Sequence, residues 1–209
     1  MSLDPISHAA EPDVPAAAAR ALSRTLMAAI LGDATGTEMT TLTVARRAEP
    51  LAPARLARTA PGGTAGRRRA RELYERCLRV YRDHLQDTEG PDDDVAAAAA
   101  HFVAANFQAL HGSVASSTTR LALERQLAGL IRRGSLWNQA SASERQAFFE
   151  SMALLAVLIG ESARQALRQG PAARDHLRRA ARGYLRQLLG LEPDALLLGP
   201  DGLTLRDED

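Results

Sequence analysis

Residues 144–169 read ERQAFFESMALLAVLIGESARQALRQ, and this stretch decides the fold class. Between Met152 and Ile159 it is apolar on nearly every side, a pattern typical of a helix buried at the centre of a bundle. Ser141 and Glu144 have capping-box spacing and predict where this helix begins. A Gly-Pro pair follows and predicts where it ends. We therefore expect one central helix, with the rest of the chain packed around it.

Four further segments carry apolar side chains at helical spacing, two of them ending at glycines 112 and 134. An aspartate cluster at 92–94 and a serine-threonine cluster at 116–119 predict two of their starts. The sequence thus predicts an all-α, Leu/Ala-rich helical bundle of about five main helices over residues 67–191. The four segments run from Arg67 for about five turns, from Val95 to Gly112, from the caps at 116–119 to Gly134, and from Pro171 to Gly190.

The composition agrees with this fold class. Hydrophobic residues make up 45% of the 209 residues and aromatic residues only 4%. Alanine supplies roughly a fifth of the chain, while Val and Ile are scarce. This excludes a doubly wound α/β enzyme and an all-β barrel. The chain has 26 basic and 25 acidic side chains, so no global field recruits nucleic acid or acidic lipid. Every fixed basic side chain is an arginine, which reflects either a GC-rich genome or selection for arginine chemistry.

The segments outside the bundle differ in kind. We expect residues 1–13 to be disordered and residues 14–32 to form an amphipathic N-terminal helix whose apolar face holds Leu22, Leu26, Ala29 and Ile30. Residues 33–66, rich in proline, glycine and threonine, are interpreted as a flexible linker. Residues 192–209 predict an extended acidic tail, with two short extended pieces around a turn at 199–202.

Single polar residues in the sequence give little indication of catalysis, ligand binding or metal binding. Asn106 interrupts an apolar face, and it is either a buried asparagine bonded to a backbone or neighbouring helix, or a group that orients a ligand. Cys77 is interpreted as a small buried hydrophobe, and as the lone cysteine it cannot form an intramolecular disulfide. The histidines lack the spacing of metal ligands on a helix. We therefore expect no catalytic residue, no metal and no cofactor. The five histidines are at positions 8, 84, 101, 111 and 176.

Two arginine sets concentrate charge, one in the helix that begins at Arg67 and one near residue 178. Their first interpretation is two solvated helix faces with partial neutralisation by the acidic tail. The alternative is contact with an anionic partner, either protein or nucleic acid. The candidate contact residues are Arg67, Arg68, Arg69, Arg71, Arg178 and Arg182.

Several motifs resemble a family of bacterial all-helical proteins known as a domain of unknown function. They are DDDVAAAAAHFVAANFQALHG at 92–112, a later RQL, SERQAFFESMALLAVLIG at 143–160, and GYLRQLLG with GPDGL near the end. The resemblance covers about residues 73–203, and its most specific part is the acidic cap, the alanine run and Ala104-Ala105-Asn106. It implies no activity. Many members of that family carry a secretory leader.

These observations favour a non-enzymatic helical protein–protein interaction module, such as an adaptor, chaperone or scaffold, that binds itself or another protein. One alternative is a nucleic-acid-binding protein that uses the Arg67–Arg82 helix, although its near-neutral charge makes nucleic acid an unexpected partner. A second is an enzyme of unknown reaction, which would need Asn106, His101 and a carboxylate to meet in a pocket.

We expect no membrane span. We also expect a cytoplasmic protein, or a periplasmic or secreted one if a leader has been removed. The oligomeric state is left open.

Overall fold

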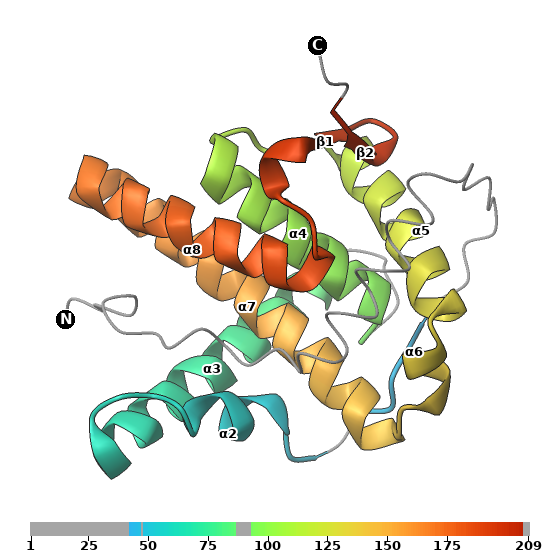
Figure 1. Ribbon diagram of the computed structural model, residues 1–209. Coiled ribbons are helices and arrows are strands. Elements are labelled where there is room, and N and C mark those ends of the chain that lie inside the picture. Colours follow the sequence, from blue (N-terminus) through green and yellow to red (C-terminus); the bar gives the residue numbers. More distant parts are fainter. Residues whose placement is uncertain (1–41, 47, 87–92, 207–209) are drawn as a thin grey trace.

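The computed structural model describes residues 42–46, 48–86 and 93–206, and it confirms the all-α class (Figure 1). Three of its long helices pack directly against the helix at 142–169, as the apolar stretch at 144–169 predicts. The elements are α2 (Ala52–Ala57), α3 (Gly63–Gln86), α4 (Val95–His111), α5 (Ser117–Arg133), α6 (Ser135–Gln139), α7 (Ala142–Gln169), α8 (Pro171–Leu189), η1 (Pro193–Ala195), β1 (Leu196–Gly199) and β2 (Gly202–Leu205).

The core is centred on the packing of α4 against α7, with α3, α5 and α8 packed around this pair. Phe102 on α4 and Phe149 on α7 are fully buried. The alanine run at 96–100 is also buried, because its short side chains let neighbouring helices approach closely. Helix α7 is long and apolar enough to cross a membrane by length and composition, and 78% of its most apolar window is buried inside the fold.

The predicted helix boundaries have physical causes that the structure confirms. The side chain of Asp94 accepts a hydrogen bond from the Ala97 N–H at the start of α4. Ser141 and Glu144 form the full capping box of α7. Gly112 and Gly190 end α4 and α8 in the left-handed conformation, which satisfies the last carbonyl groups without a Cβ clash.

The predicted linker at 33–66 is wrong for its described part. Leu42, Ala52 and Leu56 are buried, the last two belong to α2, and α3 begins at Gly63 rather than near residue 67. Helix α2 holds only six residues, too few to show a helical period. The predicted N-terminal helix at 14–32 and the disordered segment at 1–13 lie outside the described residues.

The C-terminal segment forms the predicted pair of short extended pieces. Strands β1 and β2 pair antiparallel, with Leu196 opposite Leu205 and Gly199 opposite Gly202. Leu196 and Leu203 are buried, which attaches the hairpin to the bundle. Gly202 has a φ of +92°, so the turn between the strands needs a residue without a Cβ.

Candidate functional site

Helices α2 and α3 together form a strongly basic surface, which we call the arginine arm. They pack against each other and lie at the lower left of the molecule (Figure 1). Between residues 52 and 79 the chain has eight arginines and only two acidic residues, Glu72 and Glu75. Every one of these arginines is exposed. The eight are Arg55, Arg58, Arg67, Arg68, Arg69, Arg71, Arg76 and Arg79.

Ion pairs within the arm engage only a minority of these arginines. Arg71 Nε lies 2.7 Å from Glu75 Oε1, and this hydrogen bond raises the pKa of Arg71. Arg68 Nε lies 3.8 Å from Glu72 Oε1. Such exposed pairs contribute little to stability, so they do not explain why so much charge gathers here. Among the described residues, no ion pair engages Arg55, Arg58, Arg67, Arg69, Arg76 or Arg79.

Arg82 belongs to the same helix but is not part of this surface. Its guanidinium group donates two hydrogen bonds of 3.0 Å to the carboxylate of Asp93, and its side chain is only 13% exposed. It also lies over the Phe149 ring, 5.9 Å from the centroid. The nucleic-acid alternative uses the whole helix from Arg67 to Arg82. In the structure, Arg82 at the end of that stretch is engaged in a contact that stabilises the fold.

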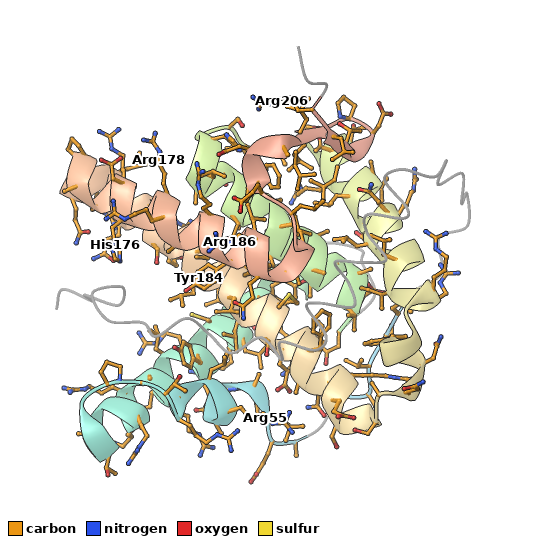
Figure 2. All side chains as sticks on the ribbon, in the orientation of Figure 1. Arg55, His176, Arg178, Tyr184, Arg186 and Arg206 are labelled. Carbon is orange, nitrogen blue, oxygen red and sulfur yellow. The ribbon has the colours of Figure 1, made fainter. Side chains whose placement is uncertain are left out.

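The second arginine set, on α8, is more fully neutralised. Arg182 Nη1 lies 2.5 Å from Asp194 Oδ2, and Arg186 Nη1 lies 3.6 Å from Glu192 Oε1. Arg178 pairs with Asp175 at 3.3 Å on its own helix. Figure 2 shows Arg178 and Arg186 along α8, well above Arg55 of the arm. The acidic partners of Arg182 and Arg186 both lie in the predicted acidic tail, so the tail neutralises part of the positive charge on α8. The positive charge of the arginine arm is less fully neutralised.

The polar residues that could favour an enzyme do not meet. Asn106 is fully buried, and its Nδ2 donates to the Phe102 carbonyl at 2.8 Å, within its own helix. His101 lies five residues earlier, about 140° around α4, with Nδ1 3.1 Å from the Ala97 carbonyl. Its Nδ1 also lies 3.3 Å from the Tyr81 hydroxyl. Burial, followed by the charge of Arg120, lowers the pKa of His101. The two side chains therefore serve different faces of the helix.

Three buried carboxylates hold other parts of the chain in place, and apart from the predicted cap at Asp94 the sequence did not indicate these contacts. Glu150 is fully buried, and its Oε2 accepts hydrogen bonds from the N–H groups of Leu51 (2.6 Å) and Ala52 (2.9 Å), which fixes the start of α2. Asp94 accepts from the Leu42 N–H at 2.6 Å, besides capping α4. A glutamate inside the run at 148–156 was the available signal, because an acidic group there requires buried donors. Asp93 is the partner of Arg82 described above.

Cys77 is a buried, free thiol. Burial raises the pKa of the Cys77 thiol to about 11, so it stays protonated near neutral pH. This agrees with its interpretation as a small buried hydrophobe. Within the described ranges, no group of three or more His, Cys, Asp and Glu side chains could hold a metal ion.

The fold and this surface define a helical bundle with a basic helical arm. The chain belongs to DUF6683, a family of unknown function, because the family matches residues 9–206. This confirms the predicted membership of a family of unknown function. The match is wider than the predicted 73–203, and it includes the segment before the bundle. No curated protein and no solved structure gives a significant match to the chain.

Proposed function

We propose that this protein is a non-enzymatic interaction module and that its arginine arm binds an acidic segment of another protein. The observation that carries this proposal is the excess of exposed arginine over acid on α2 and α3. A guanidinium group presents a planar pair of N–H donors that match a carboxylate, so an arginine surface suits a glutamate- or aspartate-rich partner. Such a surface mainly speeds association and selects for charge.

The buried polar groups support a scaffold role for the rest of the molecule. Asp94, Glu150 and the pair of Arg82 with Asp93 hold the segment at 42–46, the start of α2 and the end of α3 against the bundle. These contacts set the position of the arm. An interaction module needs such a rigid base, because a preordered surface loses less entropy when it binds.

Anisotropy titration of a fluorescent glutamate-rich peptide at low and moderate salt tests the proposal. The test variant changes Arg67, Arg69 and Arg76 to Ala, and the matched control changes Arg174, Arg178 and Arg179 to Ala on α8. We expect the arm variant to weaken binding at least about tenfold, since it loses several charge contacts, and the α8 control to bind as the unchanged chain does. Equal affinities for the two variants, or no binding at low salt, would contradict the proposal.

Nucleic acid is the second candidate, and one observation favours it. Helices α2 and α3 are joined by a short turn that includes Gly62 at φ +88°, and a helix–turn–helix order can present the second helix to a duplex. The same titration with labelled duplex DNA, single-stranded DNA and RNA examines it. Binding that is tighter than peptide binding, and that falls by orders of magnitude over a few-fold rise in salt, would replace the protein partner with a nucleic acid.

A further inference from the structure

We infer that the outer edge of β1 pairs with the same edge of a second copy of the chain and joins the two hairpins into one antiparallel sheet. The edge consists of the backbone groups of Leu196 and Leu198 that point away from β2, together with the Leu197 side chain between them. We call it the β1 edge. It is separate from the arginine arm, so the pairing does not depend on what the arm binds.

The hydrogen bonds of the hairpin determine which backbone groups of β1 point outward. In an antiparallel pair of strands, hydrogen-bonded residue pairs alternate with pairs whose N–H and C=O groups point away from the partner strand. The Arg206 N–H donates to the Ala195 carbonyl at 2.9 Å, so these two residues form a hydrogen-bonded pair. In the register of the hairpin, Leu196 and Leu198 therefore belong to outward-pointing pairs. Leu203, opposite Leu198, points its own backbone groups away from β1 in the same way.

The two outer edges of the hairpin differ in how their backbone groups are satisfied. On β2, the Leu203 N–H and carbonyl are both bonded to the side chain of Gln126. On β1, the Leu196 N–H donates to the Pro193 carbonyl. Within the described residues, no hydrogen bond engages the outward Leu196 carbonyl or either outward group of Leu198, and only β2 packs closely against β1. The β1 edge therefore presents one donor between two acceptors.

The β1 edge also lacks the features that keep edge strands from pairing. Natural edges usually carry a charge, a proline or a bulge that blocks another strand. Strand β1 reads LLLG and contains none of these side chains. Leu196 is buried against the bundle, whereas Leu197 points to the opposite face and is 43% exposed. An uncharged edge with an exposed leucine favours pairing with another strand.

A second copy of the same strand complements this edge. When two β1 strands run antiparallel about a two-fold axis at Leu197, the Leu198 N–H of each copy faces the Leu196 carbonyl of the other. Donor and acceptor are thus matched in both directions, and the Leu196 N–H keeps its bond to Pro193. The two Leu197 side chains lie directly opposite each other in a non-hydrogen-bonded pair, where side chains approach most closely. A two-fold axis at Leu198 would instead set Leu197 against Gly199, so the first register buries more apolar surface.

The position of the hairpin leaves the arginine arm open in such a dimer. Figure 1 shows β1 and β2 at the top of the molecule and α2 and α3 at the lower left. A dimer through the β1 edge therefore carries two arms. If the arm binds acidic segments as proposed, a partner with two such segments gains avidity from this arrangement.

Sedimentation of the full chain at concentrations up to about 0.5 mM tests the pairing, because so small a contact forms a weak dimer. Leu197→Lys places two like charges at the two-fold axis. Thr204→Lys is the matched control, since Thr204 is exposed, lies opposite Leu197 and belongs to β2. We expect Leu197→Lys to lower the association constant about tenfold, and Thr204→Lys to dimerise as the unchanged chain does. A chain that stays monomeric, or a dimer that both variants affect equally, would overturn the inference.

Amide hydrogen exchange of the unchanged chain, followed residue by residue by NMR, gives a second measurement that needs no substitution. The Leu198 N–H finds a partner only in the dimer, whereas the Leu203 N–H is bonded to Gln126 in either state. We expect exchange at Leu198 to slow severalfold over the same concentration range and exchange at Leu203 to stay constant. Exchange at Leu198 that does not depend on concentration would overturn the inference. If only an added leucine-rich peptide slowed it, the inference would also fail, and the edge would belong to another protein.

Discussion

The side-chain amide of Gln126 pairs with the backbone of Leu203 as a neighbouring β-strand would. Its Nε2 donates to the Leu203 carbonyl at 2.9 Å, and its Oε1 accepts from the Leu203 N–H at 2.9 Å. Outer edges of strands need partners for these groups. One residue of α5 thus covers the outer edge of β2 and attaches the C-terminal hairpin to the bundle.

Gln126→Ala is expected to destabilise the protein by about 1–3 kcal/mol, because both backbone groups of Leu203 lose their partner at a half-buried site. Urea unfolding followed by circular dichroism measures this change. Gln169→Ala, on an exposed side chain at the end of α7, is the control and should have almost no effect. If the two variants unfold at the same urea concentration, the Gln126 contact does not stabilise the hairpin.

Glu150→Gln tests the carboxylate that fixes the start of α2. The Oε2 atom accepts from two backbone N–H groups, and the Oε1 atom accepts from Gln146 Nε2 at 2.6 Å. An amide in this place directs one NH₂ group at a donor, so it loses at least one charge-assisted hydrogen bond. We expect a loss of about 2–3 kcal/mol in unfolding free energy.

Glu161→Gln is the matched control for Glu150, because Glu161 lies on the same helix and is exposed. Hydrogen exchange adds a local readout, since the Glu150 variant should speed exchange of the amides at 51 and 52 more than those of α8. Uniform acceleration over the whole chain would show that Glu150 supports general stability and does not specifically hold α2.

Arg82 and Asp93 form the most enclosed ion pair described. The Asp93 side chain is 5% exposed, and its other cation, Arg46 Nε, is 3.9 Å away. Arg82→Leu should cost about 3–5 kcal/mol, because it leaves a buried carboxylate with one distant partner. Asp93→Asn is the informative second variant, since asparagine tolerates the positive φ of 53° at this position.

A double-mutant cycle separates the interaction energy of the Arg82–Asp93 ion pair from the effect that each substitution has by itself. Once Asp93 is replaced by Asn, the further change Arg82→Leu should cost clearly less than it does alone, because no buried charge is left unpaired. Additive costs, measured by denaturant unfolding, would mean that the two side chains act independently.

The parts predicted from the sequence are those set by local chemistry. Three helix boundaries depend on contacts within one helical turn, so the amino-acid sequence alone indicates them. They are the capping box at Ser141, the acidic cap at Asp94 and the C-terminal glycine at Gly190. Helix α2 was missed because its stability comes from Glu150, which is 98 or 99 residues away along the chain. Contacts of this range depend on the packed fold and have no local signature.

Contacts between elements also decide which arginines are exposed. The helix that begins at Arg67 was predicted as one charged face, but Arg82 finds its partner across the segment at 87–92 and leaves the surface. Arg55 and Arg58 join the surface only because α2 packs against α3. Tertiary packing, rather than the count of charges in one helix, therefore decides which arginines are available to a partner.

The thiol of Cys77 gives a prediction with a defined pH dependence. Its ordinary pKa is 9.0, and burial raises the pKa to about 11 in the folded chain. Below pH 9 the thiol is protonated in both states. Between about pH 9 and 11 the folded chain keeps a proton that the unfolded chain releases, so the contribution of this group to stability falls as the pH rises. The loss is at most about 2–3 kcal/mol. Unfolding free energies of the unchanged chain and of Cys77→Ala, measured from pH 8 to 11, isolate this effect as the difference between the two curves. Above pH 9, the unfolding free energy of the unchanged chain should fall relative to that of Cys77→Ala. Parallel curves would show that the thiol titrates alike in the folded and unfolded states.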